Sequence, residues 1–369
     1  MIRSFLKNYR ISITAIGPVF IGSGKEISKR EWILDRKQNI AYIPDEKKMF
    51  RYLSEHNLLK SYEDYMINDK RDLFGWAREN GLFPRNIDKV VKYTLDCDGI
   101  AQVNTIKGIQ IFIKDGLGKP YIPGSSLKGA LRNAILAKLE ADDTSSSYAA
   151  KIRNSASDFK GRTSYLKRDA DELNAEYLNT LNRPQTRRRD AVNDIMSGIR
   201  VSDSMPLDYS DLTLCQKIDA GTDGRDNKIN IFRECIKPGV TAEFMLTIDA
   251  TVTDMSVSFI QQAISEYLEN YNREFLGKFE SEELYSGNVI YLGGGAGFHT
   301  KTVTSNILSG ERDRVDVTAN IIMNTVNREM KKKHYKDKAL GVSPHTVKLT
   351  EYDRSLYQFG PCRISFEPV

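Results

Sequence analysis

Residues 121–132 read YIPGSSLKGALR, and this stretch is the most informative part of the chain. A Tyr-Ile-Pro-Gly segment precedes Ser125, which can cap the start of a helix that we expect to run to about Glu140. Leu127 and Leu131 lie four positions apart, so they fall on the same face of that helix. The stretch therefore predicts an amphipathic helix with one apolar stripe.

The rest of the chain supplies strands and a second long helix. Alternating and β-branched residues predict the strands, and a long apolar face predicts the helix. The expected strands are 10–21, 199–207, 239–251 and 363–366, and the expected second helix is 256–283. With the insertions removed, the order is βαββαβ, which is the order of ferredoxin-like α+β folds and of the RNA-recognition fold. Because this fold hosts many chemistries, the order alone predicts no function.

Three long insertions interrupt this core. Residues 44–95 carry aromatic side chains mostly at helical spacing and predict a helical insert, preceded by a short hairpin within 32–43. Residues 142–198 are rich in Ser, Asp and Arg, with weak periodicity, and predict a flexible basic insert. Residues 208–230 are dense in Gly, Asp and Asn and predict a protruding, thumb-like flap.

The chain has 369 residues, enough for one elaborated domain or two. We assign residues 1–305 to a core with insertions and residues 306–369 to a basic helical extension that returns a strand to the core. The content of 40% hydrophobic and 28% charged residues is that of an ordinary globular protein. Neither a membrane-spanning apolar run nor a signal-peptide pattern is present, so we expect a cytoplasmic protein.

The net charge of +5 is small, but its distribution is uneven. Residues 328–348 hold seven basic and two acidic residues, and residues 144–200 hold eleven basic and seven acidic residues. Basic stretches on a nearly balanced chain favour a phosphate-bearing partner, although solvated loops without a partner have the same composition.

Metal and disulfide chemistry have few candidates. The four cysteines are far apart without a CxxC pair, so we expect free thiols in a reducing compartment. The four histidines form no HxxxH or HxH pair, so we predict no metal site and no cofactor.

Cations in the 121–132 stretch point to an anion site. Lys128 and Arg132 lie four apart, on a face different from the apolar stripe. A phosphate could pair with both and with the amide groups at the helix start. We therefore predict an RNA-phosphate contact, with a merely solvated basic face as the alternative; its residues are Gly124, Ser125, Ser126, Lys128 and Arg132.

Two glycine-containing segments could extend that contact. The loop YLGGGAGFHTK at 291–301 leaves amide groups exposed, so it can follow a ribose-phosphate backbone. Phe298 could stack on a base, and Lys301 could pair with a phosphate. A tight turn between core elements is the alternative. The predicted contacts here are Gly293, Gly294, Gly295, Gly297, Phe298 and Lys301. A third turn, after the first strand, adds Gly22, Ser23, Gly24 and Lys25, and the three turns could line one groove.

Catalytic candidates are few. His299, beside the glycine loop, could act as a general base on a 2′-hydroxyl, with Lys301 stabilising the developing charge. With these two roles, the alternative function is that of a metal-independent endoribonuclease that processes repeat RNA. A third possibility is a capping protein whose grooves contact protein rather than RNA.

Three of these stretches together resemble the RAMP proteins of CRISPR effector complexes: TAIGPVFIGSG at 14–24, YIPGSSLKGALR at 121–132 and GGGAGFHTK at 293–301. The resemblance covers about residues 10–305. Within that group, PVFIGSGKE, the 32–43 hairpin and GFHTKT are similar to the fifth Csm subunit of type III-A systems.

The resemblance implies a non-catalytic RNA-binding subunit that caps the filament of backbone subunits at the 3′ end of the guide RNA. It also implies support of crRNA maturation in antiviral defence, through a recruited host nuclease. The related backbone subunit carries a catalytic aspartate after its first strand. Here Glu26 is the sole acid within 22–30, so target-RNA cleavage is not expected. The implied partners are guide RNA and other Csm subunits, above all the backbone RAMP subunit.

Overall fold

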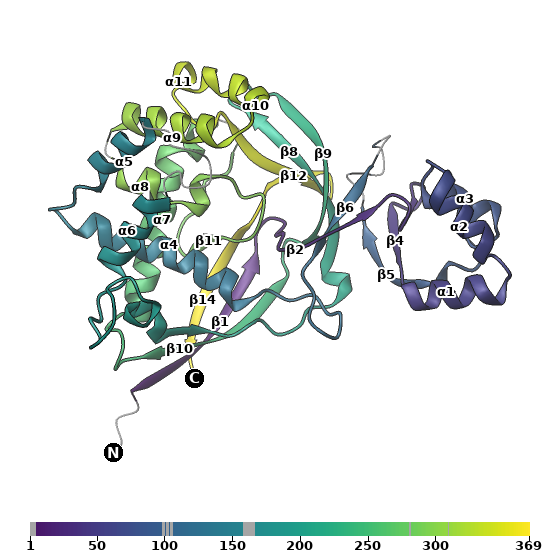
Figure 1. Ribbon diagram of the computed structural model, residues 1–369, viewed down its shortest axis with the longest axis horizontal. Helices are drawn as coiled ribbons and strands as arrows, with labels where there is room; N and C mark the ends of the chain where they lie inside the picture. Colours follow the sequence, from purple (N-terminus) through teal and green to yellow (C-terminus); the bar gives the residue numbers. More distant parts are fainter. Residues whose placement is uncertain are drawn as a thin grey trace.

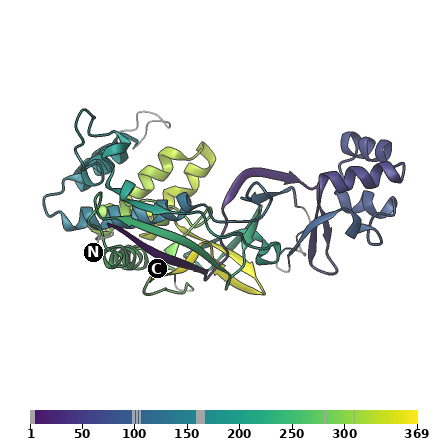
Figure 2. The ribbon, with the colours of Figure 1, turned by 90° about the horizontal axis from the view of Figure 1, so that it is seen from below.

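The computed structural model describes residues 5–369 except 98–99, 101–102, 104–105, 158–166, 280–281 and 309. The chain forms a mixed α+β structure built on two sheets, with most helices gathered over the first (Figure 1). A separate group of three helices lies at the far end of the second sheet (Figure 2). No helix within the described residues is both long and apolar enough to cross a membrane.

The first sheet has the strand order β11-β14-β1-β10-β7, and every neighbouring pair is antiparallel. In β1, Ile11 and Ile13 are buried because successive side chains alternate between the two faces. The predicted strands at 199–207 and 239–251 are shorter than expected, and the C-terminal strand is longer. The strands are β1 (Leu6–Ala15), β7 (Ile199–Val201), β10 (Thr241–Asp249), β11 (Val289–Tyr291) and β14 (Pro361–Pro368).

Two long helices, α4 (Gly124–Asp142) and α7 (Val257–Glu274), pack against each other and share one apolar core with the first sheet. The expected stripe in α4 is buried, but the expected cap is wrong. Pro123 is the N-cap residue and Ser125 lies inside the helix. At α7 the Ser256 hydroxyl accepts a hydrogen bond from the Phe259 amide, and the helix ends well before residue 283.

The second sheet has the order β2-β6-β9-β8-β5-β4-β3, and β12 adds to it through β8. The hairpin expected at 208–230 is present as β8 and β9, but it is no free flap, because both strands have neighbours in the middle of the sheet. The strands are β2 (Gly22–Ser28), β3 (Ile33–Asp35), β4 (Ile40–Pro44), β5 (Val91–Asp96), β6 (Gly108–Phe112), β8 (Leu212–Gly221), β9 (Asp226–Ile236), β12 (Thr346–Tyr352) and β13 (Ser355–Gln358).

The helical insert has a hydrophobic cluster of its own, which includes Tyr52, Tyr65 and Trp76. This explains the aromatic spacing as packing, although Phe50 is 63% exposed. The end of the expected insert is not helical, because residues 91–96 form β5 and pair with β4. Its helices are α1 (Glu46–Glu55), α2 (Leu59–Asn68) and α3 (Leu73–Glu79).

The remaining helices cluster beside α4 and α7 (Figure 1). The expected basic insert forms two helices, and its residues 158–166 lie outside the described residues. Within the expected basic helical extension, α9 begins at Glu311 and ends at Thr325, and two shorter helices follow it. These helices are α5 (Tyr148–Ser157), α6 (Lys167–Tyr177), α8 (Thr304–Ile307), α9 (Glu311–Thr325), α10 (Arg328–Lys333) and α11 (Asp337–Leu340). Short 3-10 turns are η1 (Ile87–Lys89), η3 (Ala191–Asn193), η4 (Ile195–Gly198), η5 (Tyr209–Asp211), η6 (Leu276–Lys278), η7 (His299–Lys301) and η8 (His334–Lys336).

Candidate nucleic-acid interface

The start of α4 is partly occupied by the protein itself. The Gly124 amide donates to Asp203 Oδ1 at 2.8 Å. A Cβ at Gly124 would lie 2.3 Å from the Ser202 carbonyl oxygen, so glycine is required here by the chain that follows β7. Gly129, in contrast, faces open space. The close approach at Gly124 is therefore made by this protein's own backbone.

Lys128 and Arg132 differ in their environment. Arg132 donates to Asp194 Oδ2 at 2.7 Å and to Asn174 Oδ1 at 3.1 Å. Lys128 has neither a hydrogen bond nor an ion pair through its ammonium group to any described residue. Partial burial lowers the pKa of Lys128, and the nearby guanidinium groups of Arg132 and Arg200 lower it further, against the opposing effect of Asp194. Lys128 is thus a cation that an added anion would stabilise.

The glycine loop at 293–297 packs closely on the connection between β1 and β2. The Gly294 amide donates to the Phe20 carbonyl at 2.6 Å. Gly293 has φ of 74°, and a Cβ there would lie 2.1 Å from the same oxygen. A side chain at Gly293 would therefore meet both an unfavourable backbone region and a steric clash. Gly297 also has positive φ, but no atom of the described residues lies within 4 Å of its Cβ position.

One cavity brings two of the predicted segments together. It has a volume of about 300 Å³ and is lined by residues of α4, α5, α6 and α9 and by the segment after the glycine loop. Arg132, Phe298 and Lys301 all contribute to its wall. Burial and the charge of Arg233 lower the pKa of Lys301, whose ammonium group pairs with no acid in the described part of the chain. Two cationic side chains, Arg132 and Lys301, and the aromatic ring of Phe298 therefore line the same cavity.

The third predicted segment lies elsewhere. Residues 22–25 belong to β2, and the expected turn is wrong because this segment pairs with β6 around a bulge. The Ser23 hydroxyl donates to the Ile111 carbonyl at 3.0 Å. Lys25 is exposed, but it does not line the cavity with Lys301. The glycine loop contacts Phe20, two residues before Gly22, and so lies next to the start of the third segment without sharing the cavity with Lys25.

Arg233 is a residue of this region that the sequence reasoning missed. Its guanidinium carbon lies 5.0 Å from the ring centre of Phe20 and 5.7 Å from that of Phe359, and its Nε donates to Gln110 Oε1 at 2.9 Å. A Cβ at Gly295 would lie 2.5 Å from an Arg233 nitrogen. No local pattern marks this arginine, because the register of β9 against β6 places it beneath the loop.

His299 is not placed for base catalysis. The side chain is 6% exposed, and its Nε2–H donates to the Ser343 carbonyl at 2.7 Å. Its Nδ1 is buried without a hydrogen-bond partner among the described residues. Burial lowers the pKa of His299 to about 4, so the ring is neutral near pH 7. A general base must reach the proton that it removes, and neither nitrogen of this ring reaches an open surface.

The cysteines are free thiols, as predicted: Cys97, Cys215, Cys235 and Cys362 are all buried and unbridged. Two of the four histidines, His334 and His345, lie on either side of Asp337, although their spacing in the sequence is not that of a paired metal-ligand motif.

A known class of proteins combines two sheets, a helix that starts at a Gly-Ser-Ser-Leu-Lys-Gly segment and a glycine loop, which here packs on the connection between β1 and β2. Residues 12–298 match the RAMP superfamily, and the chain belongs to that superfamily. Within it, the chain is similar over its whole length to proteins called CRISPR system Cms protein Csm5, in agreement with the resemblance to the fifth Csm subunit.

The protein of Mycobacterium tuberculosis (strain CDC 1551 / Oshkosh) is 28% identical over 98% of both chains. That of Enterococcus italicus is 25% identical, again over 98% of both chains. Two solved structures share the fold. A Csm-crRNA-target RNA ternary complex of a type III-A CRISPR-Cas system contains a chain with a TM-score of 0.66 and 18% identity, covering 97% of this chain and 100% of that one. The crystal structure of T. onnurineus Csm5 gives a TM-score of 0.61 and 20% identity, covering 95% and 99%.

Proposed function

We propose that this protein is a non-catalytic RNA-binding subunit of a type III-A Csm effector complex. In this role it caps the backbone filament at the 3′ end of the guide RNA and supports crRNA maturation in antiviral defence. The observation that carries the proposal is the cavity where Arg132, Phe298 and Lys301 meet. Full-length similarity to Csm5 proteins, and the fold shared with a chain of a Csm-crRNA-target RNA complex, support it.

Lys128 and Lys301 are the proposed principal phosphate contacts, with Lys25 as a more distant one. Each ammonium group is without an acidic partner in the described structure, so a phosphate would neutralise it without breaking an existing pair. Phe298 is the proposed stacking surface for a base at the cavity. Such contacts fix the position of RNA without reading its sequence. Arg132 is already paired with Asp194, so its proposed role is to hold α4 in place.

The first sheet is the proposed ferredoxin-like core. Its elements follow the chain order β1, α4, β7, β10, α7 and β14, and the strand order β14-β1-β10-β7 with antiparallel neighbours supports this assignment. The second sheet and the three-helix insert are then additions to that core. The proposed partners are guide RNA, the backbone RAMP subunit and a recruited nuclease, in the cytoplasm.

The test is co-expression of a tagged copy with the other proteins of a candidate type III-A operon, followed by sequencing of the RNA in the purified particle. We expect a multisubunit particle with guide RNA for the wild type. Lys128→Glu/Lys301→Glu should lose this chain from the particle or leave longer, ragged 3′ ends. Lys60→Glu, an exposed lysine on α2 far from α4, is the matched control and should behave as the wild type. A double variant with wild-type particle and RNA ends would contradict the RNA contact.

The endoribonuclease alternative is tested with the wild-type chain alone. It requires cleavage of repeat RNA without metal, abolished by His299→Ala and by a 2′-deoxy substrate. The burial of both His299 nitrogens argues against it. The protein-contact alternative requires that Lys128→Glu/Lys301→Glu leave RNA protection intact.

A further inference from the structure

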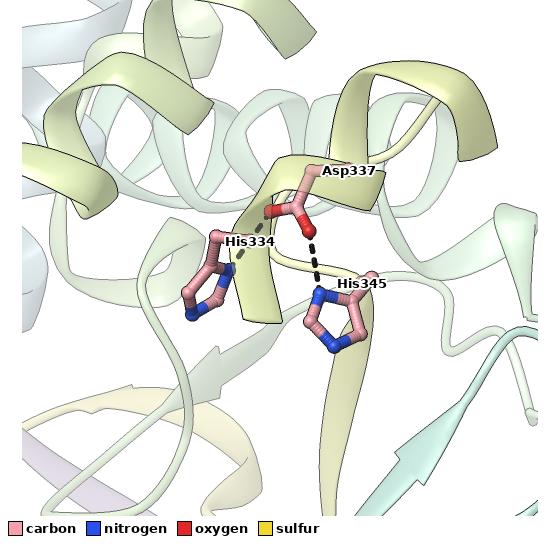
Figure 3. Close-up of side chains that lie close together, drawn as sticks. All are labelled: His334, Asp337 and His345. Carbon is pink, nitrogen blue, oxygen red and sulfur yellow. Dashed lines mark hydrogen bonds and ion pairs between the residues drawn. The ribbon is translucent and has the colours of Figure 1, made fainter. Parts of the chain in front are cut away.

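A buried carboxylate lies between two imidazole rings in the C-terminal extension (Figure 3). His334 Nδ1 lies 2.9 Å from Asp337 Oδ2, and His345 Nδ1 lies 2.5 Å from Asp337 Oδ1. Asp337 is completely buried and both histidines are 8% exposed. The three side chains can each offer one ligand atom such that all three atoms lie within 4.8 Å of one another.

We propose that His334, Asp337 and His345 bind one divalent transition-metal ion of the zinc type. Two imidazole nitrogens and one carboxylate oxygen are a ligand set that Zn²⁺ uses, whereas Ca²⁺ and Mg²⁺ prefer oxygen ligands alone. Ligand atoms bound at about 2.0–2.2 Å in a tetrahedral site lie roughly 3.3 Å from one another. The two nitrogens lie 2.9 and 2.5 Å from different oxygens of Asp337, and the three ligand atoms lie within 4.8 Å of one another, so side-chain shifts of about 1–1.5 Å would admit the ion.

The protonation states are compatible with binding. Without metal, each Nδ1–H donates to Asp337; with metal, each Nδ1 offers its lone pair and the ring proton is carried on Nε2. The second nitrogen of each ring points away from the carboxylate (Figure 3), so that proton does not face the ion. The Ser343 hydroxyl donates to Asp337 Oδ2 at 2.8 Å and can orient the carboxylate from outside the ligand set.

The site would fix the basic end of the chain. His334 belongs to η8, Asp337 to α11, and His345 directly precedes β12, so one ion would tie the exposed Lys332, Lys333 and Lys336 to the second sheet. Metal binding at residues that lie together only after folding adds its free energy to the stability of the folded chain. This inference is independent of the proposed RNA contact, because neither α4 nor the glycine loop supplies a ligand.

The test uses the full chain, freed of metal with a chelator, and titrates it with Zn²⁺ against a chromophoric competitor. We expect one Zn²⁺ per chain and a rise in the thermal unfolding midpoint. Asp337→Asn and His345→Gln should each weaken binding more than about 100-fold, since even outside partners of ligands contribute 10–100-fold. His56→Ala, at an exposed histidine outside the site, is the matched control and should bind Zn²⁺ as the wild type does. Ser343→Ala removes only the outer partner of Asp337 and should weaken binding by less than either ligand variant.

Co²⁺ gives a second measurement that needs no variant. The wild-type chain should show the visible bands of tetrahedral Co²⁺ without the thiolate-to-metal charge-transfer band of a cysteine site. A wild-type chain that binds neither Zn²⁺ nor Co²⁺ stoichiometrically would overturn the proposal. So would a thiolate band, or unchanged affinity in both ligand variants.

Discussion

The guanidinium of Arg132 lies 2.7 Å from the carboxylate of Asp194, at the edge of the cavity that Lys301 also lines. This pair joins α4 to the residue that caps η4 and neutralises the arginine from within the protein. Lys128, one turn earlier on α4, has no such partner in the described structure. The two cations of one short motif therefore have different roles: one holds the fold, and the other is open to an anion.

Arg132→Ala should lower the free energy of unfolding by about 1–2 kcal/mol, because it leaves the half-buried Asp194 without its charged partner. Lys128→Ala should change it by less than about 0.5 kcal/mol, since no described interaction is lost. Urea unfolding of both variants measures the difference. Equal losses in the two variants would show that Lys128 is also structural.

Lys128→Ala/Lys301→Ala should weaken binding of single-stranded RNA and make it less dependent on salt. Each phosphate contact contributes about 0.7 to the slope of log K against log salt concentration, so the double variant should reduce the slope by about 1.4. Fluorescence anisotropy at several low salt concentrations gives the slope. Lys60→Ala should leave it unchanged, and an unchanged slope in the double variant would rule out these two lysines as phosphate contacts.

Gly124→Ala and Gly129→Ala should have opposite effects, although both residues lie in α4. The added methyl group at 124 would meet the Ser202 carbonyl, with an expected loss of about 1–3 kcal/mol. At 129 the methyl group would meet no other atom of the described structure, and alanine should stabilise the helix by roughly 0.5–1 kcal/mol. Thermal or urea unfolding separates the two. A loss at both positions would refute the assignment of Gly129 to an open face.

The burial of His299 predicts a pH-dependent contribution to stability. Its pKa is about 4 in the folded chain and 6.5 when exposed, so the unfolded chain binds more protons between these values. Stability should therefore fall as pH drops from above 6.5 towards 4, with about 3 kcal/mol of that loss due to this ring. His299→Gln does not titrate and should lose about that much less over the same range. Parallel pH profiles of wild type and variant would contradict the burial of His299.

Much of the local structure could be predicted from the sequence. The spacing of Leu127 and Leu131 predicted α4, and the alternation around Ile11 and Ile13 predicted β1. The aromatic spacing within 44–95 predicted the helical insert, whose helices end at Glu79. The predictions that were wrong concern the ends of helices and strands and the turns between them. Residues 22–25 look like a turn because of their glycines, but pairing with β6 makes them a strand.

The candidate site was predicted only in part. Residue type indicated that Lys128 and Lys301 could meet phosphate, and the cavity containing Arg132, Phe298 and Lys301 is consistent with one shared region. The reason for the glycines differs from the prediction, because Gly124 and Gly293 accommodate this protein's own carbonyl groups.

The sequence by itself determined which side chains of a helix or strand are buried, because apolar residues recur every 3.6 positions in a helix and every two in a strand. Both periods can be read from a few neighbouring residues. Tertiary structure alone decided which distant groups meet. The register of β9 against β6 places Arg233 beside the glycine loop, and the packing of α4 places Arg132 beside Asp194. The turn before β12 brings His345 to the Asp337 carboxylate, which His334 also contacts. These pairings depend on how folded elements are placed in space, and that placement is set by the whole core rather than by any local pattern.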